Sequence, residues 1–237
     1  MLQSLQLHAV TRDIPTIADQ ALVAHIVALS PYVDAIQLRE KSRSPKALAL
    51  LIERLLQADV PADKFIINDR ADIALAFGIQ KVHLTEQSLP LSRLEAAFPT
   101  LQWGRSFHSV NAVEKQLSHY DYGYLGHIFP TEAKEYAPLG VDYLQLAYEA
   151  INAECRLNGG NKASAGKLIA IGGINLGNVE SLFPFADGIA LMSTLFPLRD
   201  YRLDTDQAVR QAAQFQQILT KKEEREKRDK RSDNDDT

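Results

Sequence analysis

Asp121-Tyr-Gly-Tyr-Leu-Gly-His-Ile-Phe-Pro-Thr-Glu-Ala-Lys134 joins a short apolar strand to a polar loop. Residues Asp121 to Leu125 are typical of a buried strand, and His127 follows directly, with Thr131 and Lys134 further along. An imidazole can accept and return a proton near neutral pH, and a hydroxyl with an ammonium group suits an anionic substrate. The stretch therefore predicts the edge of an active site. In the alternative interpretation, His127 is a satisfied structural histidine and Lys134 a solvated charge.

Seven other short apolar runs resemble this strand, and helical segments separate most of them. Their number and spacing predict parallel strands that are buried on both faces, in a single (β/α)8 TIM barrel of the α/β class. A doubly wound open sheet is the alternative. The seven runs are Leu5 to Thr11, Val33 to Leu38, Phe65 to Ile67, Lys81 to Leu84, Leu101 to Phe107, Leu168 to Ile171 and Gly188 to Leu191.

Three sequence signals predict where helices begin. Ser44-Pro45 predicts a cap and first helical residue for Lys46 to Leu56. Ser92 and Glu95 fit a capping box before Leu94 to Phe98. Asn111 is expected to cap the helix that runs through Leu117.

The end of the chain differs from the rest in composition. The last predicted helix runs from Asp204 to Lys222, and Lys221 to Arg231 are eleven consecutive charged residues. A run of both signs without apolar partners predicts a helix that frays into disorder. We therefore expect a catalytic barrel over residues 1–220 and a disordered tail over 221–237, with a role of the tail in binding a partner as the alternative.

Composition narrows the range of functions. The 237 residues are 46% hydrophobic and 24% charged, with a formal net charge of −4, which is ordinary for a soluble globular protein and gives no field that attracts nucleic acid or anionic membranes. No apolar run is long enough to span a bilayer. The single cysteine, Cys155, excludes an internal disulfide. We expect a cytoplasmic protein without nucleic-acid or membrane partners, and the sequence leaves homo-oligomerisation open.

In a (β/α)8 barrel, the residues that follow the strands share one rim, where such enzymes carry their active sites. After the second strand, Gln37, Arg39 and Lys41 alternate and so share one face. Arg39 can hold a carboxylate or phosphate in a bidentate fork, but Glu40 and Asp69 could instead pair with these cations in structural salt bridges. The rim as a whole collects Thr11, Gln37, Arg39, Lys41, Asn68, Asp69, His83, Thr85, Ser106, His108, His127, Thr131, Lys134, Gly172, Gly173, Met192 and Ser193.

Gly172-Gly173 and Met192-Ser193 follow the last two strands, where barrels often bind a phosphate through main-chain amides. Glycines allow the main chain to approach an oxyanion, and Ser193 adds a hydroxyl. A tight strand-to-helix turn is the alternative explanation of the glycine pair.

The sequence gives little support for a metal site. Asp69 lies at the predicted rim, whereas Asp72 and Glu86 are less well placed for the carboxylates that Mg²⁺ prefers. His83, His108 and His127 could share the mouth, but their spacing is not that of a zinc site. We therefore expect neither a metal nor a cofactor.

Six motifs together resemble those of the thiamine phosphate synthase/TenI superfamily and cover most of the chain apart from its tail. They are Gln37-Leu-Arg-Glu-Lys41, Ile67-Asn-Asp-Arg70, Val82-His-Leu84, Gly104-Arg-Ser-Phe-His108, Gly126 to Lys134 and Ala170-Ile-Gly-Gly-Ile174. The synthase branch has a proline where this chain has His127, a threonine in place of Ala133, and an acidic magnesium ligand where Ser88 stands. Gly-His-Ile-Phe is instead similar to the TenI branch of thiazole tautomerases.

The resemblance implies a cofactor-free isomerase that binds a thiazole phosphate and aromatises it by proton transfer through His127. It also implies that Gly172, Gly173 and Ser193 hold the phosphate, that Arg39 or Lys134 holds the carboxylate, and that Ser106 and His108 line the pocket. The remaining expected substrate contacts are Gln37, Lys41, Asn68, Thr131 and Met192. Three alternatives stay open. They are the synthase, whose Gln37, Arg39, Lys41, Asn68 and Asp69 are retained, a non-catalytic regulator, and a phosphate-binding barrel with a different small substrate.

Overall fold

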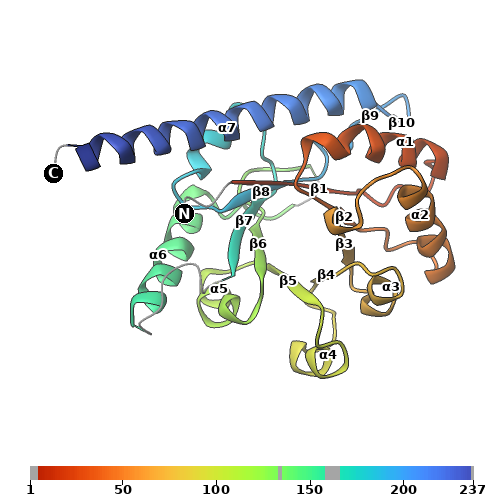
Figure 1. Cartoon of the computed structure of the whole chain (residues 1–237), viewed down its shortest axis with the longest axis horizontal. Coiled ribbons are helices and arrows are strands. Elements are labelled where there is room, and N and C mark those ends of the chain that lie inside the picture. The colour runs from red at the N-terminus through yellow and green to blue at the C-terminus, as the bar shows by residue number, and fades with distance from the viewer. Residues whose placement is uncertain (1–4, 133–134, 158–165, 236–237) are drawn as a thin grey trace.

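The computed structural model describes residues 5–132, 135–157 and 166–235, and its strands close into a barrel. All eight strands are parallel, and β1 pairs with both β2 and β8 (Figure 1). This closure confirms the (β/α)8 barrel and excludes the open sheet. The strands are β1 (Gln6–Val10), β2 (Ala35–Leu38), β3 (Phe65–Asn68), β4 (Lys81–Leu84), β5 (Gln102–Phe107), β6 (Tyr122–Gly126), β7 (Lys167–Ile171) and β8 (Gly188–Leu191).

Helices surround the barrel, as Figure 1 shows. The α-helices are α1 (Asp19–Leu29), α2 (Pro45–Gln57), α3 (Ala71–Ala76), α4 (Leu91–Ala97), α5 (Val110–Gln116), α6 (Val141–Leu157) and α7 (Thr205–Asp235). Short 3₁₀ helices are η1 (Ser30–Tyr32), η2 (Ala62–Lys64), η3 (Leu117–His119) and η5 (Val179–Leu182), and the last stands where an α-helix usually joins β7 to β8. A small hairpin, β9 (Leu198–Arg199) and β10 (Arg202–Leu203), precedes α7.

Two of the three predicted helix starts are wrong. Ser44 caps α2 as expected, because its side chain accepts the N–H of Ala47. Helix α4 starts at Leu91 after Pro90, and no side chain caps it, so there is no capping box. Helix α5 is capped by Ser109, two residues before the expected Asn111.

At the amino-terminal end of the barrel, three of the strands are each preceded by an aspartate that is hydrogen-bonded to the neighbouring strand. Asp34, Asp121 and Asp187 stand just before β2, β6 and β8. Each donates its N–H to the carbonyl of one residue in the preceding strand, and its carboxylate accepts the N–H of that same residue. The residues held in this way are Leu7, Trp103 and Leu168, at N···O distances of 2.7, 2.7 and 2.8 Å.

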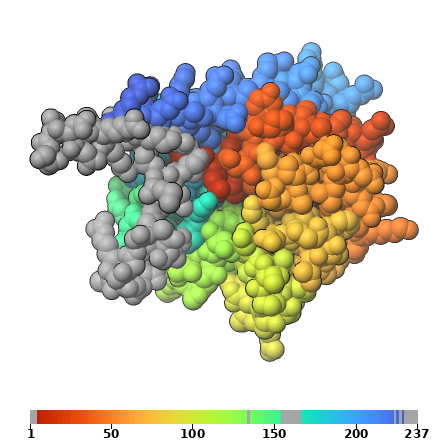
Figure 2. Space-filling model, in the orientation of Figure 1, coloured from red at the N-terminus to blue at the C-terminus, as the bar shows by residue number. Residues whose placement is uncertain are grey.

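Helix α7 lies beside α1 along one flank of the barrel (Figures 1 and 2). Buried His25 of α1 joins the two helices, because its Nδ1 is 2.9 Å from the Thr205 hydroxyl. Helix α7 reaches Asp235, further than the predicted end at Lys222, and among its described side chains Leu219 is the last one in the hydrophobic core. The division into a barrel and a disordered tail stays a prediction. In the described residues, no helix has the length and apolar character needed to cross a bilayer.

Candidate active site

His127 lies at the carboxyl end of the barrel, directly after β6, and its main chain is fixed on both sides. The peptide carbonyl before it, on Gly126, accepts the Nδ1–H of His108 at 2.9 Å. The next two residues donate their N–H groups toward β7, from Ile128 to the Ile171 carbonyl at 2.9 Å and from Phe129 to the Gly172 carbonyl at 3.0 Å. The loops after β5, β6 and β7 therefore form one connected unit around His127.

His127 is 5% exposed, and its two ring nitrogens have different surroundings. Nε2 is 3.2 Å from the main-chain carbonyl of Tyr136, whose ring packs edge-on at 4.8 Å. A carbonyl only accepts hydrogen bonds, so in the neutral ring the proton is on Nε2. Nδ1 then carries the lone pair, and it is buried without a hydrogen-bond partner among the described residues. Nδ1 is therefore the ring nitrogen that could accept a proton.

The glycine pair after β7 approaches His127 closely. Gly172 and Gly173 have φ values of 98° and 66°, in the region that favours glycine. A Cβ on Gly172 would lie 2.3 Å from the Cβ of His127, and a Cβ on Gly173 would lie 2.4 Å from the Pro130 carbonyl. Glycine is therefore required at both positions by packing as well as by backbone conformation.

The loop after β8 lies beside this glycine pair. The Thr194 hydroxyl donates to the Ile174 carbonyl at 3.1 Å and joins the two loops. Ser193 is exposed, whereas Met192 is half-buried against the barrel interior. Within the described parts of the chain, the N–H groups of Gly173 and Ser193 donate to no protein acceptor. Such unpaired amides in adjacent loops suit an oxyanion.

Two amide side chains form a buried pair at the ends of β2 and β3. Gln37 Nε2 donates to Asn68 Oδ1 at 3.0 Å, and the two residues are 2% and 8% exposed. Gln37 Oε1 is buried and has no partner in the described structure. Buried acceptors are seldom left unpaired in proteins, so this oxygen is a candidate contact for a substrate.

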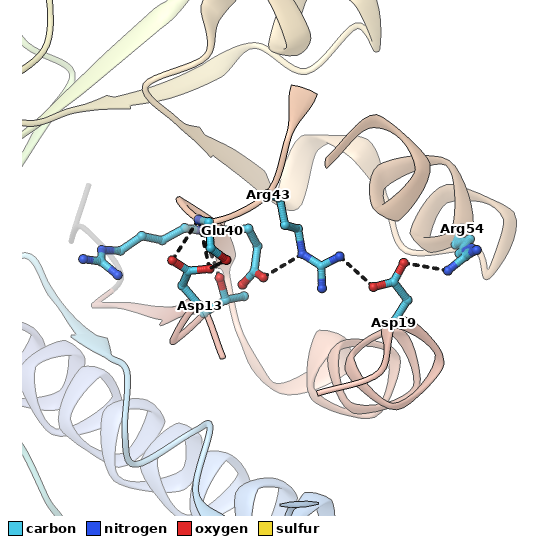
Figure 3. A network of polar contacts seen from close by, with 8 residues as sticks. Asp13, Asp19, Glu40, Arg43 and Arg54 are labelled. Atoms are coloured by element: carbon cyan, nitrogen blue, oxygen red, sulfur yellow. Dashed lines mark hydrogen bonds and ion pairs between the residues drawn. The ribbon is translucent and has the colours of Figure 1, made fainter. Parts of the chain in front are cut away.

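Arg39 and Lys41 follow β2, and they are not the structural salt-bridge partners that the alternative interpretation requires. Glu40 pairs with Arg43 at 2.9 Å (Figure 3). Among the described side chains, neither Arg39 nor Lys41 forms an ion pair. Both cations are therefore available to an anionic ligand.

Ser106 is held by a histidine that lies inside the barrel rather than on its rim. The Ser106 hydroxyl is 2.8 Å from His83 Nε2, and His83 Nδ1 is 3.1 Å from the Tyr122 hydroxyl. Burial is the main cause that lowers the pKa of His83 from 6.5 to about 3, with smaller electrostatic contributions from the nearby His8, Arg39 and Lys41 side chains. His83 is therefore neutral near pH 7 and orients the serine hydroxyl.

The barrel interior contains polar residues that sequence reasoning missed. His8 Nδ1 is 2.9 Å from the Tyr124 hydroxyl, and burial, with the charges of Lys81 and Lys167, lowers the pKa of His8 to about 3. The sequence feature that could have indicated this polar interior is the spacing of Tyr122 and Tyr124, two residues apart, which places both rings on one face of β6.

Two other predicted contacts remain undefined. Thr131 is half-buried in the loop after β6 and already has an interaction partner. Lys134 lies outside the described residues, so its predicted role stays a prediction.

The described residues contain no preformed cluster of metal ligands, since no group of three or more of their His, Cys, Asp or Glu side chains could hold a metal. Asp69 and Ser88 line a cavity of about 330 Å³ beside α3 and α4. The Ser88 hydroxyl accepts the N–H of Thr85 at 2.8 Å. Ser88, which stands where an acid was expected, is therefore hydrogen-bonded within its own loop.

Known proteins share both the sequence and the fold. The chain is 39% identical over 174 residues to a thiamine-phosphate synthase of Chlorobium luteolum, which covers 71% of this chain and 76% of the relative. It is 30% identical over 184 residues to a thiamine-phosphate synthase of Pyrococcus furiosus, covering 76% of this chain and 83% of the relative.

Solved structures show the same fold. A thiamine phosphate pyrophosphorylase from Pyrococcus furiosus matches with a TM-score of 0.69 at 24% identity, covering 92% of this chain and 97% of the other. One from Bacteroides thetaiotaomicron matches with a TM-score of 0.62 at 20% identity, covering 92% and 98%. The family model described as thiamine monophosphate synthase matches residues 7–195. From this match and from the relatives above, the chain belongs to the thiamine monophosphate synthase (TMP-TENI) family.

Proposed function

We propose that the protein is a thiazole tautomerase, which converts the non-aromatic carboxythiazole phosphate tautomer into the aromatic carboxythiazole phosphate. The observation that carries the proposal is the state of His127, whose Nε2–H is directed at the Tyr136 carbonyl while Nδ1 is buried and unpaired. A tautomerase needs one group that takes a proton and returns it, and the imidazole supplies such a group without a metal.

In the proposed reaction, His127 Nδ1 removes the proton from the ring carbon that bears the carboxylate. The electron pair of that C–H bond moves through the ring, and the exocyclic double bond takes up the same proton from the imidazolium. Substrate and product are isomers, so no other reactant is consumed, and aromatisation provides the driving force. The Tyr136 carbonyl stabilises the imidazolium between the two transfers, because it accepts the hydrogen bond of Nε2–H.

Substrate binding would use the two sides of the mouth. The unpaired amides of Gly173 and Ser193 suit the phosphate, and Arg39 suits the carboxylate because it lacks an acidic partner among the described residues. Ser106, His108, Thr131 and the Gln37–Asn68 pair would surround the ring. Lys41 and Met192 complete the proposed contacts, together with Gly172 beneath His127.

A synthase activity is the second candidate, and the names of the relatives favour it. Such a reaction releases diphosphate, which a divalent metal normally neutralises. The position of the expected acidic magnesium ligand is taken by Ser88, whose hydroxyl is hydrogen-bonded within its own loop. This loop favours the tautomerase over the synthase.

The test is the ultraviolet time course of aromatisation of the non-aromatic tautomer, with a chelator present. We expect a rate well above the spontaneous one, and a loss of at least about a hundredfold in His127→Gln, the usual magnitude for a general acid/base. His119→Gln is the matched control, because His119 is exposed in η3. Circular dichroism would check that both variants are folded.

Two results would contradict the proposal, namely no acceleration by the wild-type protein or full activity in His127→Gln. In the first case, magnesium and the pyrimidine diphosphate would be added with thiazole phosphate. Formation of thiamine phosphate would then establish the synthase.

A further inference from the structure

The loops after β1 and β2 are joined at two points that flank Lys41. The N–H of Arg39 donates to the hydroxyl of fully buried Thr11 at 2.9 Å. The Asp13 carboxylate accepts the N–H of Ser42 at 3.0 Å and also its hydroxyl. The main chain that carries Arg39 and Lys41 is therefore held on both sides by the neighbouring loop.

A chain of ion pairs extends from this segment to the helices (Figure 3). Arg43 binds Glu40 through Nε at 2.9 Å and Asp19 of α1 at 2.6 Å, and Asp19 also binds Arg54 of α2 at 2.8 Å. The side chains of Glu40 and Arg43 are 4% and 14% exposed, whereas that of Arg54 is 50% exposed. The Glu40–Arg43 pair is thus largely shielded from water, whereas Arg54, at the other end of the series of ion pairs, is half-exposed.

The ion pair with Arg43 determines which cation the Glu40 carboxylate binds. Glu40 lies between Arg39 and Lys41 in the sequence, so its carboxylate could neutralise either cation. Arg43 instead keeps that carboxylate paired and buried. Without Arg43, a buried Glu40 would need another cation, and the two flanking ones are the nearest in sequence.

We infer that Asp13 and Arg43 are positioning residues, which hold Arg39 and Lys41 as an unpaired cationic pair for an anionic group of the substrate. Asp13 fixes the path of the main chain, and Arg43 removes the competing carboxylate. Neither needs to touch the substrate. This inference deepens the proposed function, and its role for the substrate carboxylate rests on that function.

Asp13 allows a clean substitution. Its φ is 56°, so alanine would add backbone strain, whereas glycine accepts this conformation and asparagine tolerates it. Asp13→Gly removes the carboxylate, and Asp13→Asn keeps one acceptor oxygen for Ser42. Arg54→Ala is the control, because Arg54 is the outer end of the same chain of ion pairs.

Binding of inorganic pyrophosphate without metal, measured by calorimetry, tests the cationic pair independently of turnover. We expect Asp13→Gly to weaken binding about tenfold, equivalent to about 1.4 kcal/mol, with Asp13→Asn and Arg54→Ala within about threefold of wild type. Arg43→Ala should also weaken pyrophosphate binding, and adding Glu40→Gln to the Arg43→Ala variant should restore it. In the tautomerase assay, Asp13→Gly should raise KM about tenfold and leave kcat within about twofold, the pattern of lost uniform binding.

Several outcomes would overturn the inference. They are no pyrophosphate binding by the wild type, wild-type affinity in Asp13→Gly, or a fall in kcat at unchanged KM. If the proposed function is wrong, the pattern is different. The wild type and the variants then do not convert the non-aromatic carboxythiazole phosphate tautomer, but their pyrophosphate affinities still follow the expected order.

Discussion

At the scale of single residues, the candidate site depends on how closely the loops after β6 and β7 approach. Gly172 lies beneath His127, where a Cβ would be 2.3 Å from the Cβ and 2.7 Å from the Cα of the histidine. The Gly172 carbonyl also accepts the N–H of Phe129 at 3.0 Å. The imidazole therefore has its position because residue 172 has no side chain.

We expect Gly172→Ala to displace His127 and to lower kcat of the tautomerase by at least about tenfold, since misplacing a reacting group by an ångström is costly. The positive φ of 98° adds backbone strain of about 1–3 kcal/mol, measurable by urea unfolding. Gly177→Ala is the control in the same loop, where a Cβ would meet only the Asn175 side chain at 3.2 Å. Equal kcat in the two variants would show that the close approach does not position His127.

At the scale of elements, the aspartates before β2, β6 and β8 connect strand pairs at the end of the barrel opposite the site. Asp187 is the most buried of them, at 7% exposure, and its carboxylate accepts the N–H of Leu168, which is 0% exposed. A buried N–H without an acceptor carries the full cost of its desolvation. The carboxylate therefore stabilises the contact between β7 and β8.

Asp187→Ala should lower the free energy of unfolding by about 1–3 kcal/mol, because the Leu168 N–H loses its partner inside the protein. Asp187→Asn keeps an acceptor oxygen and should recover most of that loss. Urea unfolding of both variants measures the difference. The interpretation would be wrong if the alanine and asparagine variants were equally stable.

The strands were predictable because parallel strands buried on both faces leave continuous apolar runs, as Leu168 to Ile171 illustrates. The cap of α5 could not be predicted, because Ser109 and Asn111 are both good capping residues and only the structure shows that Ser109 caps the helix. His127 and Gly172 could be placed at the carboxyl end of the barrel because they directly follow β6 and β7, whereas His83 was expected on the rim and lies inside the barrel.

Ion pairs and hydrogen bonds between different loops could not be predicted from the sequence. Spacing alone allows Glu40 to bind Lys41 or Arg43, and only the fold brings Asp19 to Arg43. Similarly, the Tyr136 carbonyl that assigns the tautomer of His127 comes from a separate part of the loop after β6.

At the scale of the whole molecule, the barrel is filled partly by histidine and tyrosine rings instead of aliphatic side chains. His83 and Tyr124 have ring centroids 4.5 Å apart, and His8 lies 5.7 Å from Tyr124. Both histidines are hydrogen-bonded to tyrosine hydroxyls as neutral rings. Since every strand contributes to this interior, the protonation of these rings affects the stability of the barrel as a unit.

These two histidines should therefore contribute to unfolding in acid, together with His25, whose pKa is also lowered by burial. Burial lowers the pKa of His8 and of His83 from 6.5 to about 3, so the unfolded chain binds protons that the folded chain does not. The stabilisation is complete above pH 6.5 and is lost as the pH falls from 6.5 toward 3, with a slope that approaches about 1.4 kcal/mol per pH unit for each histidine. Urea unfolding between pH 7.5 and about 5, above the range in which most carboxylates titrate, measures this slope. His8→Gln should reduce it by the contribution of one histidine, whereas exposed His119→Gln should leave it nearly unchanged. An unchanged slope in His8→Gln would mean that His8 is not held neutral inside the barrel.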